Sequence, residues 1–176
     1  ASYNGDIDFA WCLGGNLYSS NPDSVFAGQA LAKIKTILYM NTTLNKGHLF
    51  AQGKETIILP VLARDEEAQS TTQESMFNFV RLSDGGPKRI KSLMSETEII
   101  SKIGSKMFST SPINWEEMKN HQNIRHLISQ TIPGMELLKT IGESKQEFTI
   151  ANRTLTSPQF FTPSKKAIFS ICIPIN

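Results

Sequence analysis

Three short apolar runs dominate the first third of the chain, at residues 7–13, 34–40 and 56–62. Polar or glycine-rich residues bound each run, and each is too continuous for a strand that has one face in water. We therefore expect three buried strands in a mostly parallel sheet. Because parallel neighbours need a crossover connection, a helix must join the first strand to the second.

The segment between the first two runs carries the signals of that helix. Asn21 can cap its start, Pro22 suits the first helical position, and Asp23 favours the positive end of the helix dipole. An apolar face would follow, formed by Phe26, Ala27, Ala30, Leu31 and Ile34. Strand, helix and strand together predict one β–α–β unit.

Two more helices are predicted after a strand at 77–82 and a glycine-rich turn. Ser95 and Glu98 have the spacing of a capping box at the start of the first helix. The second helix would begin near Asn114. Side chains expected to point inward are Ile99, Ile103 and Met107 in the first helix, and Met118, Ile124, Leu127 and Ile128 in the second. We expect the two helices to form an antiparallel layer over residues 92–140.

From residue 146 the pattern changes to period two, which is typical of strands. Residues 147–150 and 154–156 alternate on either side of a turn, which predicts a β-hairpin. The whole pattern indicates an α/β fold with a mostly parallel sheet and a C-terminal β-hairpin or strand extension.

The composition is that of an ordinary globular chain and argues against several classes of protein. The 176 residues are 39% hydrophobic and carry a net charge of +2, with basic residues scattered among acids, so no nucleic-acid surface is predicted. No apolar stretch reaches the roughly 20 residues that a membrane helix needs. Cys12 and Cys172 each lie inside an apolar run, as buried free thiols do, and we expect a reducing, cytoplasmic compartment.

The two ends suggest a piece of a longer chain. The first residue is Ala1 instead of methionine, and residues 167–176 form an apolar run with no following strand to pair with. A strand at 168–175 would then leave an open edge. We therefore expect some tendency to dimerise through the C-terminal strand, which light scattering at several concentrations would detect.

Gly14, Gly15 and Asn16 end the first predicted strand and form the first candidate site. Open α/β sheets bind ligands at the carboxyl edge of their strands, and glycines there leave backbone N–H groups uncovered. A Cβ would hold a phosphate or ribose away from these amides. The stretch is neither GxGxxG nor a P-loop, so a bare sharp turn is an equal alternative. Asp23 would also compete with an anion for the helix N-terminus.

The loop at 41–48 follows the second strand and so lies at the same predicted edge. Asn41, Thr43 and Asn45 offer amides and hydroxyls to a base or sugar, and Lys46 could reach a phosphate. The alternative is a solvated turn rich in asparagine and threonine.

Asp65 and Glu67 follow the third strand. A polar loop that pairs Arg64 with a nearby carboxylate is commoner there than a Mg²⁺ site, because no phosphate loop accompanies these acids. His121 and His126 fall on a predicted helix without acidic or cysteine partners at ligand spacing, so we expect surface or packing roles. The residues predict no metal site, catalytic dyad or nucleophile elbow.

In their order these loops resemble the large-subunit family of molybdopterin-dependent oxidoreductases, in its formate-dehydrogenase-like branch. The stretches that carry the match are GGNLYSSNPDSVFAGQALAKIKTILYMNTTLNKGHL, ETIILPVLARDEEAQSTTQESMFNFVRLSDGG, PINWEEMKNHQNIRHLI and FFTPSKKAIF. The resemblance covers the chain from about residue 6 to its end.

This resemblance implies a cofactor. In the family the matching region binds one nucleotide arm of bis(molybdopterin guanine dinucleotide), which carries molybdenum. The residues that would line this arm are Gly14, Gly15, Asn16, Asn41, Thr43, Asn45, Asp65 and Glu67, with Thr71, Thr72 and Glu74 in the stretch along the cofactor crevice. Many relatives carry an acid near position 41, whereas Asn41 can accept from guanine only through one carbonyl oxygen. Selectivity for guanine is therefore not implied there.

The resemblance also divides the chain. Residues 1–145 would be a Rossmann-like, three-layer cofactor-binding domain, with its helical layer at 92–140, and residues 146–176 a β extension that starts a following barrel. The molybdenum ligand and any iron–sulfur cluster lie outside these residues in the family, so the chain alone should be inactive. Its partners would be the remaining domains of the same chain and a redox partner protein.

Two other functions stay open. A free-standing α/β nucleotide-binding or regulatory module without redox activity fits the same loops, and the length of the parent gene would distinguish it. A third possibility is a hydrolase that uses His48, Asp65 and Glu67. Alanine substitutions at these residues that leave a purified activity intact would exclude it.

Overall fold

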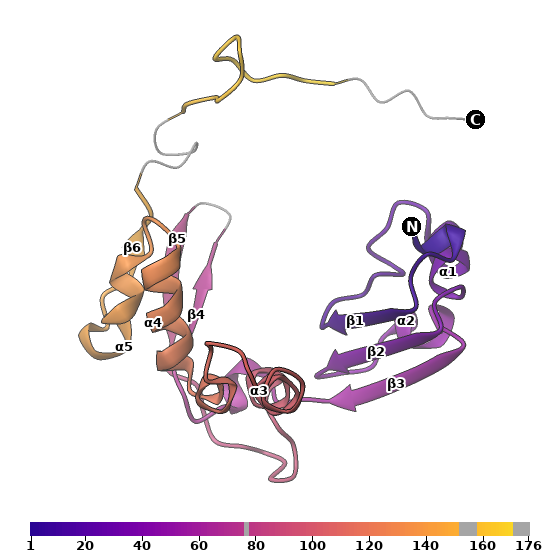
Figure 1. The fold of residues 1–176 in the computed structure, drawn as a ribbon, viewed down its shortest axis with the longest axis horizontal. Helices are drawn as coiled ribbons and strands as arrows, with labels where there is room; N and C mark the ends of the chain where they lie inside the picture. Colours follow the sequence, from indigo (N-terminus) through magenta and orange to yellow (C-terminus); the bar gives the residue numbers. More distant parts are fainter. Residues whose placement is uncertain (76–77, 152–157, 171–176) are drawn as a thin grey trace. The chain divides into compact units, whose positions relative to one another are not determined.

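The computed structural model describes residues 1–75, 78–151 and 158–170 (Figure 1). The chain forms two compact units. Unit 1 comprises Ala1–Gln69 and Gly85–Asn120, and unit 2 comprises Ser70–Asp84 and His121–Asn176. The predicted boundary between residues 145 and 146 falls inside unit 2, and the division into 1–145 and 146–176 stays a prediction.

A three-stranded parallel sheet forms the centre of unit 1. Its strands are β1 (Phe9–Leu13), β2 (Thr36–Asn41) and β3 (Glu55–Pro60), in the order β1-β2-β3. The register pairs the last residue of β1 with Met40 and the last two residues of β2 and β3 with each other, so the three carboxyl ends lie at one edge. The parallel sheet predicted from the apolar runs is confirmed.

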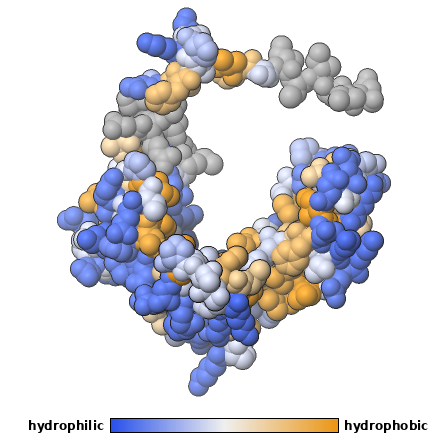
Figure 2. Space-filling view, viewed as in Figure 1, coloured by the Kyte–Doolittle hydropathy of each residue, from blue (hydrophilic) through white to orange (hydrophobic). Residues whose placement is uncertain are grey.

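Helices cover both faces of this sheet. On one face, Tyr39 packs in a cluster with α1 (Ser24–Leu31) and with Ala51, which follows α2 (Lys46–Phe50). On the other face, Leu38 packs with α3 (Glu96–Met107). Successive side chains of β2 enter opposite clusters because a strand alternates its faces. The three layers confirm the predicted Rossmann-like α/β class. Figure 2 shows apolar surface, in orange, in the region of unit 1. Exposed apolar side chains of the three strands include Phe9, Leu13 and Ile57.

The N-cap of α1 lies two residues after the predicted one. Asp23 is the N-cap and accepts a hydrogen bond from Phe26 N at 2.9 Å, so the cap assigned to Asn21 was wrong. The loop before α1 turns back on itself, so the Asn21 side chain donates to the Leu17 carbonyl. This side chain is therefore not available to cap the helix. The predicted buried face is confirmed except for Phe26, which is 50% exposed and stacks on Tyr3.

α3 begins as predicted, with the Ser95 hydroxyl accepting from Glu98 N at 3.2 Å. The Glu98 carboxylate pairs with Lys102 at 3.0 Å instead of closing the capping box. Ile99 and Ile103 pack toward the sheet, but the prediction for Met107 was wrong: at the last turn this side chain is 67% exposed. The predicted second helix is two elements in different units, the 3₁₀ helix η3 (Trp115–Lys119) in unit 1 and α4 (His121–Thr131) in unit 2.

Unit 2 contains a small antiparallel sheet. Its strands are β4 (Thr71–Glu74), β5 (Phe79–Ser83) and β6 (Phe148–Thr149), with β5 in the centre. Its core consists of Val80, Met135, Leu138, Ile141 and Ile150, and the remaining helical elements are η4 (Glu136–Lys139) and α5 (Ile141–Ser144). The strand predicted at 77–82 matches β5 in its described part, whereas β4 was not predicted.

α4 buries different side chains from those predicted. Ile128 packs on the core of unit 2, but Ile124 and Leu127 are only half-buried, and the fully buried residues of α4 are His121 and Arg125. His121 Nδ1 and Arg125 both donate to the Ser70 carbonyl, at 3.2 and 2.8 Å. The backbone before β4 therefore determines that the buried face of α4 is polar.

The described C-terminal segment, 158–170, holds turns and extended chain, with Thr162 Oγ1 donating to the Lys166 carbonyl at 2.8 Å. The described segment contains no strand, so residues 168–170, the start of the strand predicted at 168–175, are not in one. Most of the predicted hairpin and the end of the predicted C-terminal strand lie outside the described residues. In the described part of the chain, no helix is both long and apolar enough to cross a membrane. Two short 3₁₀ helices complete the list of elements, η1 (Ser2–Asn4) and η2 (Arg64–Glu66).

Candidate functional site

The carboxyl edge of the unit 1 sheet brings two of the three predicted loops together. Residues 14–16 follow β1 and residues 42–45 follow its neighbour β2. Asn45 Nδ2 donates to the Gly15 carbonyl at 3.0 Å, and Gly14 N donates to the Met40 carbonyl at 2.8 Å. The two loops are therefore joined directly, by side chain and by backbone.

Gly14 and Gly15 give the first loop its shape. Their φ angles are 62° and 71°, in the left-handed region that disfavours any side chain. A Cβ on either glycine would meet no atom within 4 Å, so the space beside both is open. Among the described residues, no acceptor takes the N–H of Gly15 or of Asn16. The loop thus offers two backbone donors to an incoming oxygen.

Asn16 shapes the return of this loop toward α1. Its Oδ1 accepts from Ser19 N at 3.0 Å, and its carbonyl accepts from the Ser20 hydroxyl at 2.6 Å. At the start of α1, the Asp23 carboxylate already occupies the Phe26 N–H, as the sequence suggested it would. An anion would therefore meet the loop amides and not the helix N-terminus.

The second loop contains a buried histidine that ties its polar residues together. His48 is 2% exposed and packs edge-on against Tyr39, with ring centroids 5.0 Å apart. Its Nδ1 accepts from Asn45 N at 2.8 Å, and its Nε2 lies within hydrogen-bond distance of the Asn41 amide. Asn41 is itself buried, whereas Thr43 and Lys46 on the same loop are exposed.

No positioning role was predicted for His48. A usable signal was present, because Asn45 and His48 stand three residues apart at the start of α2. That is the spacing at which an N3 side chain can reach back to the N-cap backbone.

The acidic loop has its contacts elsewhere. Glu66 accepts from Ala63 N at 2.9 Å and from Arg89 Nε at 2.5 Å, and Asp65 lies 3.9 Å from the same guanidinium. The Ala63 N–H, and then Arg89, hold the pKa of Glu66 below its ordinary value. This is a polar loop whose acids Asp65 and Glu66 pair with Arg89, whereas the sequence predicted a pair that involves Arg64. Among the described residues, no group of three acids, histidines or cysteines could hold a metal ion.

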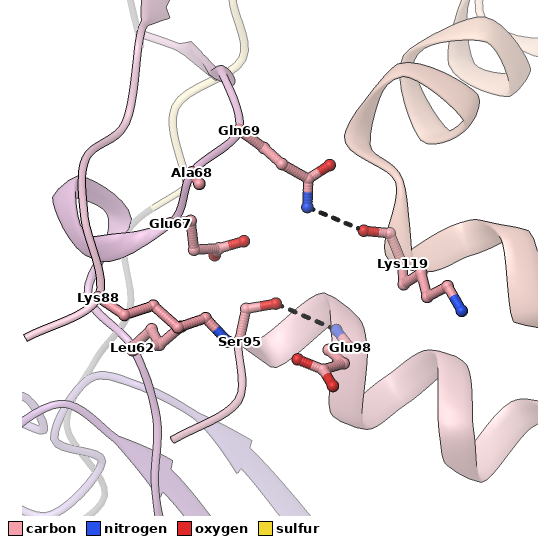
Figure 3. Close-up of a pocket in the computed structure, with 8 residues that line it drawn as sticks. All are labelled: Leu62, Glu67, Ala68, Gln69, Lys88, Ser95, Glu98 and Lys119. Atoms are coloured by element: carbon pink, nitrogen blue, oxygen red, sulfur yellow. Dashed lines mark hydrogen bonds between the residues drawn. The ribbon is translucent and has the colours of Figure 1, made fainter. Parts of the chain in front are cut away.

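Glu67 lines a cavity of about 190 Å³ within unit 1 (Figure 3). The other lining residues are Leu62, Ala68, Gln69, Lys88, Ser95, Glu98 and Lys119. Gln69 Nε2 donates to the Lys119 carbonyl across it at 3.1 Å. Burial, and then the nearby Glu67, raise the pKa of Glu96. Two carboxylates balance two lysines in the lining, so the cavity lacks the excess positive charge that would favour a second anion site.

Comparison with known proteins finds a low sequence identity to oxidoreductases. No family model matches the chain. It is 26% identical, over 180 residues, to an uncharacterised oxidoreductase of Mycobacterium bovis and to two uncharacterised oxidoreductases of Mycobacterium tuberculosis. Each alignment covers 97% of this chain but only 23% of the relative. The chain is therefore similar to one part of much longer proteins that are named as oxidoreductases.

Proposed function

We propose that this chain is a cofactor-binding segment of a molybdopterin-dependent oxidoreductase, in which the joined loops hold a nucleotide arm of bis(molybdopterin guanine dinucleotide). The similarity to oxidoreductases about four times as long supports a redox protein with further domains. The apolar side chains exposed on the sheet support the same idea, because Phe9 and Leu13 are each 53% exposed and would be covered by another domain.

The observation that carries the proposal is the pair of uncommitted N–H groups at Gly15 and Asn16, beside open space and at the carboxyl edge of a parallel sheet. Phosphate and ribose oxygens are the natural acceptors for such donors. The residues present thus fit the nucleotide arm. When bound, the cofactor would supply a molybdenum centre for electron transfer, and this chain's residues would bind and orient its nucleotide end.

Other residues predicted to bind the cofactor would contact it from the second loop and from the acidic loop. The exposed hydroxyl of Thr43 and the ammonium of Lys46 would reach sugar or phosphate oxygens from the second loop. Asp65 and Glu67 would line the outer part of the crevice, since β3 ends at the same edge.

The test is a titration of the 176-residue chain with GMP and GDP, followed by the amide chemical shifts of residues 14–16 and 42–45. We expect shifts confined to these two loops. Gly15→Ala should weaken binding by about tenfold or more, because its Cβ would enter the open space beside the amides.

Gly5→Ala is the matched control. Gly5 also has a positive φ, 81°, and open space around an added Cβ, but it precedes β1 at the opposite end of the strand. It should leave binding unchanged. Equal losses in both variants would indicate general backbone strain, and a flat titration of the unmodified chain would count against the proposal.

A further inference from the structure

His48 uses both ring nitrogens inside the protein. The Asn45 N–H points at Nδ1, at 2.8 Å, so Nδ1 is an acceptor and carries no proton. A histidine with an unprotonated Nδ1 is neutral and has its proton on Nε2. His48 is therefore the Nε2–H tautomer, and Nε2 must donate.

The donor at Nε2 determines how the Asn41 amide is turned. Nε2 faces the side-chain amide of Asn41, and an N–H can bond only to the oxygen of that group. The amide nitrogen and oxygen are nearly isosteric, so their assignment follows from the hydrogen bonds. Oδ1 of Asn41 accordingly accepts from His48, which leaves the NH₂ group on the other side. That position has no hydrogen-bond partner among the described residues and is not fully enclosed.

We propose that His48 is a positioning residue of the nucleotide site, and that it makes Asn41 a hydrogen-bond donor toward the ligand. The proposal rests on the proposed function. The single carbonyl oxygen through which Asn41 could recognise guanine N–H groups is taken by His48. At this position the site therefore binds acceptor atoms of a ligand, such as a base carbonyl, a ring nitrogen or a sugar oxygen. It offers no acceptor to the N–H groups of guanine.

Asn45 has the matching role on the second loop. Its Oδ1 accepts from Gly47 N at 2.8 Å, its Nδ2 donates to the Gly15 carbonyl, and its backbone N–H donates to His48. Both polar ends of the side chain are thus engaged within the protein. Asn45 ties the two loops together, and Gly15, Asn16 and Asn41 supply the donors that face the ligand.

The first measurement reads the tautomer directly. Long-range ¹H–¹⁵N correlation on the labelled 176-residue chain, without ligand, should show His48 Nε2 protonated and Nδ1 unprotonated at pH 8. The signals of His126 provide an internal comparison from α4. A protonated Nδ1 at His48 would overturn the proposal, whether or not nucleotides bind.

The second measurement tests the base preference with GMP and AMP. The affinity ratio of GMP to AMP for the unmodified chain is the reference value. Asn41→Asp keeps an acceptor for His48 and adds a second oxygen that can accept from guanine N–H groups, so the ratio should rise by about tenfold or more. Asn114→Asp adds the same charge at an exposed position of unit 1 and should leave the ratio unchanged.

The outcomes separate this proposal from the proposed function. No change of the GMP-to-AMP affinity ratio in Asn41→Asp would contradict the donor role of Asn41. The Nε2–H tautomer together with a flat titration by both nucleotides would uphold the assignment of His48 and count against nucleotide binding itself.

Discussion

Tyr39 shows how much of unit 1 depends on one buried hydroxyl. Its side chain is 4% exposed, and the hydroxyl donates to the Ala51 carbonyl at 2.5 Å. Burial, with a smaller effect of Cys12, raises the pKa of Tyr39 to about 12. We expect Tyr39→Phe to lower the free energy of unfolding by about 1–2 kcal/mol, because the Ala51 carbonyl would remain buried without a donor.

Urea unfolding measures this loss, with Tyr3→Phe as the control because Tyr3 is 43% exposed. Equal effects of the two substitutions would contradict the role given to the Tyr39 hydroxyl.

Glu66 makes the stability of the acidic loop depend on pH. The Ala63 N–H and Arg89 hold its pKa below the ordinary value of 4.5. Because the folded pKa is the lower one, the stabilisation is present above the unfolded value and is lost as the pH falls through the folded value. Glu66→Gln should therefore lower the free energy of unfolding at pH 7, and its difference from the unmodified chain should shrink below about pH 4.

Unfolding at a series of pH values tests this, with Glu143→Gln at an exposed position of α5 as the control. A difference that does not vary with pH would show that charge at Glu66 is unimportant.

In α3, close packing against η3 outweighs helix propensity at one position. A Cβ on Gly104 would lie 2.4 Å from ring carbons of Trp115, whose carbonyl also accepts from Ser101. Alanine gains about 1 kcal/mol over glycine in a helix interior, but overpacking costs about 1–3 kcal/mol. We expect Gly104→Ala to destabilise unit 1 by up to about 2 kcal/mol in urea unfolding.

Lys106→Ala, at an exposed site on the same helix, should change stability by less than about 0.5 kcal/mol. A Gly104→Ala chain more stable than the parent would mean that the Trp115 ring moves aside freely.

The two units provide a prediction for the molecule as a whole. Ile141 and Ile37 are both 0% exposed, the first in the core of unit 2 and the second in the core of unit 1. Truncating either to alanine should cost about 2–4 kcal/mol. We expect Ile141→Ala to accelerate amide exchange in β5 and α4, and Ile37→Ala to accelerate it in β2, each with little effect on the other unit.

Native-state hydrogen exchange on both variants makes the comparison, and each variant is the control for the other. Parallel acceleration throughout both units would show that the chain unfolds as one cooperative body.

Local signals were sufficient for much of the fold. The three apolar runs predicted β1, β2 and β3, and Ser95 predicted the start of α3, because burial of a strand and capping of a helix depend on neighbouring residues. They failed where a distant partner decides the outcome. β4 has the polar sequence TTQE and is a strand through its pairing with β5. Arg125 is buried because the Ser70 carbonyl, far away in sequence, accepts from it.

The candidate site also has features that the sequence predicts and features that depend on distant partners. From sequence it follows that residues 14–16 and 41–45 lie at one edge, since parallel strands end on the same side of their sheet. The hydrogen bond from Asn45 to Gly15 and the contact of His48 Nε2 with Asn41 could not be predicted from sequence, and neither could the ion pair of the acidic loop with Arg89. Hydrogen bonds require distances near 3 Å. For partners as far apart in sequence as Gly15 and Asn45, only the packed chain brings those distances about.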